Sequence, residues 1–91
     1  MDERSINERA KDTLDHFNIT YEDACPFSIM YRKDFAKLAP FLCGSVDPRK
    51  RFRVVIDWDP EYDIVLIRDE YDTYSQMEEL MHEQCPTVFH G

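Results

Sequence analysis

The sequence predicts a small α+β domain whose helices pack on one face of an antiparallel β-sheet. Amphipathic helical patterns occur towards both ends of the chain. Between them lie two segments rich in β-branched and aromatic residues, joined by a turn. The length of 91 residues, with 43% hydrophobic content, suffices for one hydrophobic core and leaves too little for a second. We therefore expect a single domain over residues 1–91, in the order helix, helix, strand, strand, helix.

The first helix is expected over residues 6–17. Ser5 and Glu8 have the spacing at which two side chains satisfy the free amide groups at a helix start. Apolar residues then recur along one helical face, at Ile6, Ala10, Leu14 and Phe17. This face is expected to lie in the core.

Residues 20–44 admit two interpretations, because Pro26 and Pro40 interrupt any long helix. In the first, a helical stripe runs up to Gly44 as a C-terminal cap, with members Tyr31, Phe35, Leu38 and Leu42. In the second, a short strand forms near residues 27–32 from the alternating Phe27, Ile29 and Tyr31, and only residues 34–42 are helical. Either way, the helix is expected to end near Ala39 or Leu42.

An antiparallel hairpin is the clearest element of the sequence. Arg51–Trp58 and Tyr62–Arg68 are rich in β-branched and aromatic residues, and the Asp-Pro-Glu segment between them has turn chemistry. Alternation predicts a core-facing side made of Phe52, Val54, Ile56 and Trp58. Because two strands alone are marginally stable, a third strand near residues 27–32 and dimerisation through a sheet edge both stay open.

A final helix is expected to begin after a cap at Asp72 or Thr73 and to end before Pro86. Its predicted buried face consists of Tyr74, Met77, Met81 and Cys85. Its predicted solvent face carries Glu78, Glu79 and Glu83. The tail over residues 87–91 contains two apolar residues, so it either packs on the domain or trails free.

The charge of the chain is strongly negative and unevenly placed. The net charge is −8, of which −7 lies in residues 51–91. Such a field repels nucleic acid and anionic lipid and attracts basic partners. No apolar run is long enough to span a bilayer, and the three cysteines are too few for a disulfide framework. We therefore expect a cytoplasmic protein, in the host cytoplasm if the chain is of phage origin.

The residues that could carry chemistry form no established motif. The turn carboxylates lack the glycine of a calcium loop, and His82, Cys85 and His90 lack the paired cysteines of a structural zinc site. His82 and Cys85 are one helical turn apart, but no third group marks a catalytic arrangement. With only 2 glycines, phosphate-binding loops are absent from the sequence. We expect no metal, no cofactor and no enzymatic activity.

A single basic cluster interrupts the acidic composition. It consists of Arg49, Lys50, Arg51 and Arg53, with Phe52 inside it. Taken alone, such a cluster indicates phosphate contact. The acidic segments that follow it favour internal salt bridges or a solvated loop instead.

Carboxylates dominate residues 57–83, where the net charge is −9. If the hairpin turn and the last helix lie side by side, these residues form one acidic face that also carries aromatic anchors. The predicted partner-binding residues are Asp57, Asp59, Glu61, Asp63, Asp69, Glu70, Asp72, Glu78, Glu79, Glu83, Tyr62 and Tyr71.

The leading hypothesis is a non-catalytic protein-binding module that docks on a basic surface of a partner and blocks its nucleic-acid site. In size and composition the chain resembles the acidic inhibitors of phages and mobile elements, such as nucleic-acid mimics, anti-CRISPR proteins and nuclease inhibitors. The alternative is an accessory or homodimeric structural subunit whose acidity serves solubility only.

Overall fold

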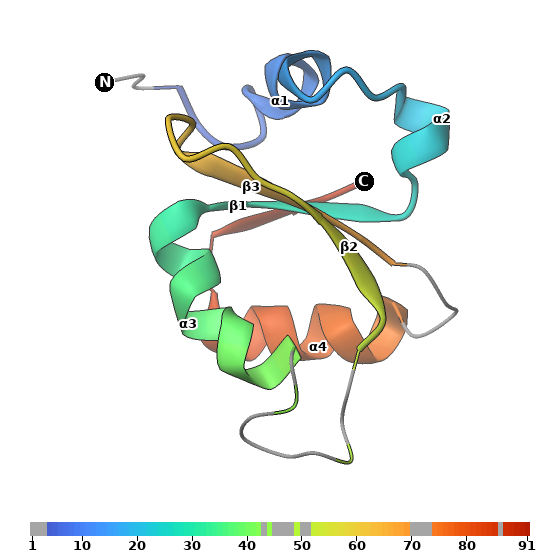
Figure 1. The fold of residues 1–91 in the computed structure, drawn as a ribbon, viewed down its shortest axis with the longest axis vertical. Coiled ribbons are helices and arrows are strands. Elements are labelled where there is room, and N and C mark those ends of the chain that lie inside the picture. Colours follow the sequence, from blue (N-terminus) through green and yellow to red (C-terminus); the bar gives the residue numbers. More distant parts are fainter. Residues whose placement is uncertain (1–3, 43, 45–48, 50–51, 70–73, 86) are drawn as a thin grey trace.

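The computed structural model describes residues 4–42, 44, 49, 52–69, 74–85 and 87–91. These residues form four helices and four strands, and the α+β fold class is confirmed (Figure 1). The helices are α1 (Ala10–His16), α2 (Tyr21–Ala24), α3 (Arg32–Leu42) and α4 (Tyr74–Gln84), and the strands are β1 (Phe27–Tyr31), β2 (Val54–Asp57), β3 (Ile64–Asp69) and β4 (Val88–His90). In the described part of the chain, no helix has the length and apolar character needed to cross a membrane.

The four strands form one antiparallel sheet in the order β2-β3-β1-β4. The predicted hairpin is confirmed as β2 and β3, with Ile56 opposite Ile67. The third strand that the sequence left open is β1, which lies in the interior of the sheet between β3 and β4. The tail packs as β4, with Phe89 opposite Ile29.

Helices cover both faces of the sheet, so the prediction of one covered face is wrong. Successive residues of β3 belong to two separate cores: Ile64 and Leu66 pack with α1 and α2, whereas Val65 and Ile67 pack with α3 and α4. Figure 1 shows the two helix pairs on opposite sides of the strands. The physical reason is the unbroken apolar run at residues 64–67, which is typical of a strand buried on both faces.

The first helix is shorter than expected. It spans Ala10–His16, and residues 6–9 precede it as turns, although Ile6, Ala10 and Leu14 are buried as predicted. The Glu8 amide donates to Ser5 Oγ at 3.3 Å, which is one half of the expected cap. Asn18 has φ 57°, a left-handed conformation that ends the helix.

The second interpretation of residues 20–44 is close to the structure. Phe27–Tyr31 is a strand, and α3 follows it directly at Arg32, so the single helical stripe that included Tyr31 is wrong. The short helix α2, which the sequence did not predict, begins at a Thr20 cap whose Oγ1 accepts from the Asp23 amide at 3.2 Å. The element order therefore gains one helix and two strands.

The final helix agrees with its predicted buried face where the structure describes it. Met77, Met81 and Cys85 are fully buried, while Glu79 and Glu83 are exposed and Glu78 is half-buried. The expected cap at Asp72 or Thr73 and the side chain of Tyr74 lie outside the described residues.

The core-facing side predicted for β2 is only partly correct. Phe52 and Val54 are half-buried against the α3–α4 core, but Ile56 is 42% exposed and Trp58 is 55% exposed. The reason is the position of β2 at the edge of the sheet, where only one neighbouring strand shields it. Burial of Trp58 is therefore a wrong prediction.

Fluorescence of Trp58, the one tryptophan of the chain, checks its exposure. We expect the folded protein to emit like indole in water, with little further red shift on unfolding. Trp58→Ala is expected to change the free energy of unfolding by no more than about 0.5 kcal/mol, as for exposed substitutions generally. A blue-shifted native spectrum, or a loss of about 3 to 5 kcal/mol, would instead indicate a buried ring.

Candidate functional site

The turn between β2 and β3, residues 58–63, docks on α1. The Tyr62 ring stacks on His16 with centroids 3.9 Å apart, and its hydroxyl lies 3.2 Å from Thr13 Oγ1. Tyr62 is therefore half-buried in the core that α1 covers. Because α4 packs on the opposite face of the sheet, the turn and α4 do not form the single acidic face that the sequence suggested.

Asp57, Asp59 and Asp63, at and beside the hairpin turn, each have a partner within the protein. Arg68 Nε donates to Asp57 at 2.9 Å, His16 Nε2 lies 3.0 Å from Asp59 Oδ2, and Arg9 binds Asp63 through two bonds of 2.8 Å. The pKa of Asp59 is lowered, chiefly because its carboxylate accepts from the Glu61 amide and further because of His16. Part of the negative charge at the hairpin is therefore neutralised by ion pairs within the protein.

The Arg9–Asp63 pair is expected to matter most for stability among these pairs. The Arg9 side chain is 6% exposed and that of Asp63 is 52% exposed. Asp63→Ala takes the carboxylate away from a buried guanidinium, which we expect to lower the free energy of unfolding by about 1 to 3 kcal/mol in urea denaturation. The exposed Arg4–Asp12 pair supplies the control, since Asp12→Ala should cost less than about 1 kcal/mol. Equal losses for the two variants would contradict the argument.

The remaining predicted partner-binding residues are spread over the structure. Glu61 is exposed at the turn, Asp69 is half-buried at the end of β3, and Glu78, Glu79 and Glu83 lie on α4. Glu70, Tyr71 and Asp72 lie outside the described residues. The charged residues therefore form separate groups on two faces of the molecule.

An exposed apolar edge on β2 is the feature that sequence reasoning missed. Val55 is 38% exposed on the α1 side, and Ile56 and Trp58, which point to the opposite face of the sheet, are more exposed still. In the described sheet β2 pairs with β3 alone, which leaves its second backbone edge open. The signal was present in the sequence as apolar residues on both sides of a short strand, Val55 as well as Ile56. Together, Val55, Ile56 and Trp58 are called the β2 edge patch below.

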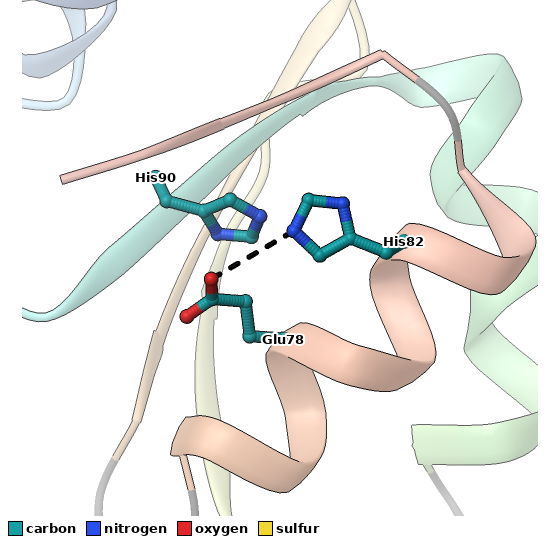
Figure 2. Close-up of side chains that lie close together, drawn as sticks. All are labelled: Glu78, His82 and His90. Carbon is teal, nitrogen blue, oxygen red and sulfur yellow. Dashed lines mark ion pairs between the residues drawn. The ribbon is translucent and has the colours of Figure 1, made fainter.

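Glu78, His82 and His90 form a cluster at the junction of α4 and β4. Figure 2 shows Glu78 and His82 on successive turns of α4, with the His90 ring of β4 turned towards them. Glu78 Oε1 and His82 Nε2 are 3.7 Å apart, and the ligand-type atoms of all three residues lie within 4.8 Å of one another. The two histidines were recognisable in the sequence as possible metal ligands, but the carboxylate of Glu78 that joins them was not.

His90 is oriented by the strand beside it. Its Nδ1 lies 2.9 Å from Ser28 Oγ of β1, and Ser28 is fully buried. Burial lowers the pKa of His90, with the nearby His82 acting in the same direction and Glu78 opposing it. The ring is thus biased towards its neutral form, in which an imidazole nitrogen can coordinate a metal ion.

The Cys85 thiol lies against α3. It is buried and donates to the Asp34 carbonyl at 3.3 Å. Burial raises the pKa of this thiol, and the negative charge of Asp34 raises it further. A thiolate is the reactive form of cysteine, so this environment favours a structural role. Cys25 is exposed, and Cys43 lies outside the described residues.

An open pocket of about 430 Å³ lies between α1, α2 and the sheet. Its apolar lining includes Leu14, Ile19, Phe27 and Phe89, and charged side chains such as Lys11 stand around it.

The predicted basic cluster is described in part only. Arg49 and Arg53 are exposed, whereas Phe52 packs on the α3–α4 core. Lys50 and Arg51 lie outside the described residues.

Comparison with protein-family models, with curated proteins and with solved structures gave no match to this chain.

Proposed function

We propose that the protein is a non-catalytic binding module that docks on a basic surface of a partner protein through the β2 edge patch. The observation that carries the proposal is the exposure of Val55, Ile56 and Trp58 on an edge strand. An extended segment of a partner can pair with such an edge through main-chain hydrogen bonds, while exposed side chains select the sequence.

The composition of the β2 edge patch and its surroundings supports a protein partner. Tryptophan is enriched among the residues that dominate interface energies, because a large ring buries much surface with few rotatable bonds. Asp59 and Glu61 follow Trp58 by one and three residues in the chain and supply an acidic rim. An apolar centre with a charged rim is the usual composition of a specific interface.

The charge of the chain supports a basic partner. A net charge of −8 accelerates encounter with a positive surface and slows it with nucleic acid or anionic lipid. We further propose that docking inhibits the partner by covering a surface that otherwise binds nucleic-acid phosphates. Asp57, Asp59 and Asp63 are paired within the protein, so they are poorly suited to mimic a row of phosphates. Apolar contact at β2, with charged residues around it, is therefore the better basis for this inhibition.

The test begins with capture of a partner at low and high salt, followed by reconstitution of the complex from purified components. We expect the association rate to fall with ionic strength, because the attraction is screened. Glu61→Lys should lower that rate and its salt dependence, and Glu83→Lys on α4, away from the hairpin turn, is the matched control. A labelled oligonucleotide bound to the partner should be displaced by the wild-type protein.

Two outcomes of this test would reject the proposal in its present form. If Glu83→Lys weakens binding and Glu61→Lys does not, the partner engages α4 and not the β2 edge. If reversal of the exposed Arg49 and Arg53 abolishes binding while both glutamate variants bind normally, the functional surface is the basic segment.

A homodimeric or accessory structural subunit is the second candidate. The open edge of β2 favours it, because two copies can pair their edge strands across a twofold axis. Sedimentation of the purified protein distinguishes the two: a dimer at micromolar concentration that Ile56→Thr dissociates supports the homodimer. A monomer leaves the β2 edge patch available to another protein.

A further inference from the structure

We propose that Glu78, His82 and His90 form a binding site for a divalent transition-metal ion of the zinc type. This site lies at the junction of α4 and β4 and is independent of the proposed function at β2. It departs from the sequence-based expectation of no metal, because the sequence showed no spacing that joins these three residues.

The helix alone does not account for the cluster. Glu78 and His82 are four residues apart on α4, and such pairs are common on helix surfaces as weak ion pairs. The third residue, His90, distinguishes this cluster from such a pair. His90 comes from β4, and its ring centroid is 5.1 Å from that of His82. Two elements distant in the sequence thus bring one carboxylate and two imidazoles to one point (Figure 2).

The distances suit a small ion after minor adjustment of side chains. Zinc binds imidazole nitrogen and carboxylate oxygen at about 2.0 to 2.2 Å, so two ligands of a tetrahedral ion lie roughly 3.3 Å apart. The Glu78 and His82 atoms, at 3.7 Å, are already near this separation. Rotation of the His82 side chain, which is 63% exposed, can bring the ligand atoms to the distance that the metal requires.

The hydrogen bond behind His90 has the arrangement found around bound metal ions. A histidine ligand usually uses one ring nitrogen for the metal and the other for a hydrogen bond that fixes the ring. Ser28 Oγ occupies the Nδ1 side of His90 at 2.9 Å. When Nδ1 donates to Ser28, Nε2 carries the lone pair that faces the cluster.

The ligand set indicates the class of metal. Two imidazoles and one carboxylate suit zinc and its neighbours in the first transition series better than calcium or magnesium, which prefer oxygen ligands. Three protein ligands leave a fourth position for water or for a ligand atom from another molecule. Bound metal would also tie β4 to α4 and so stabilise the end of the sheet.

The experiment titrates ZnCl2 into protein that carries no histidine tag and has been treated with a chelator. Calorimetry should show one ion per chain, and the melting temperature should rise with zinc concentration. Co²⁺ in place of zinc should give the visible absorption of a tetrahedral complex.

Variants separate this site from nonspecific binding. His82→Ala and Glu78→Gln change surface side chains, so both variants should fold, and each should weaken zinc binding at least about tenfold. Two controls, His16→Ala and Glu79→Gln, change the third histidine of the chain and a neighbouring exposed glutamate, and both should bind zinc like the wild type.

The proposal is overturned if zinc neither binds with a stoichiometry of one nor raises the melting temperature. It is equally overturned if His82→Ala binds zinc like the wild type, or if His16→Ala loses binding to the same extent. Loss in the two cluster variants with retention in the two controls supports it.

Discussion

Trp58→Ala is expected to weaken binding to the partner by about 30-fold or more, with the folded structure intact. Truncation of a central aromatic anchor typically costs about 2 kcal/mol or more of binding free energy, which corresponds to that factor. Trp58 meets the requirement for such an anchor because it is 55% exposed in the free protein and stands at the end of an open edge strand. Surface plasmon resonance with the purified partner should place most of the effect in the dissociation rate.

Two further variants make this measurement specific. Ile56→Thr keeps a β-branched residue on β2 and replaces apolar by polar contact, so it should weaken binding as well while preserving the strand. Tyr21→Ala is the control, since Tyr21 is also 55% exposed but lies on α2 against Phe27 of β1. If Tyr21→Ala weakens binding while Trp58→Ala does not, the docking surface is on the α2 side of the molecule.

Phe27→Ala is expected to lower the free energy of unfolding by about 3 to 5 kcal/mol, as for large buried aromatic residues in general. Phe27 is fully buried in the α1–α2 core, and its ring meets those of Tyr21 and Phe89 at centroid distances of 5.4 and 5.9 Å. Gly91 also packs tightly against the Phe27 ring, because a Cβ on Gly91 would lie 2.1 Å from it. Truncation therefore leaves a cavity at the point where α2, β1 and β4 meet.

Urea denaturation followed by circular dichroism measures this loss. Phe41→Ala on α3 is the comparison, because Phe41 is only half-buried and should show a clearly smaller effect. If Phe27→Ala lost less than about 1 kcal/mol, the α1–α2 side of the sheet would not be a packed core.

The two cores show where reasoning from the sequence was accurate and where it was not. The buried residues of α1 and α4 were predicted from helical spacing alone, since Leu14, Met77 and Met81 face the interior. The hairpin was predicted from its turn and its β-branched residues. The second covered face was missed because the apolar run of β3 was interpreted as one strand of a one-sided hairpin.

The candidate sites depended on contacts between residues far apart in the sequence. The carboxylates of the hairpin were predicted as a free acidic array, but Arg9, directly before α1, and His16 of α1 contact two of them. Ion pairs of this kind leave no local pattern, because the partners are separated by tens of residues. The cluster of Glu78, His82 and His90 likewise has no local sequence pattern, because the pairing of β4 with β1 brings His90 to α4.

Local sequence patterns were sufficient to predict the α+β class, the hairpin, the buried faces of the main helices and the excess of negative charge. These properties depend on local spacing, capping and composition, which act within a turn of helix or a pair of neighbouring strands. Three features depend instead on long-range packing: the edge position of β2, the exposure of Trp58 and the proximity of His90 to His82. Strand order and burial depend on which distant segments pack together, and that choice is made by the free energy of the whole core and not by any one segment.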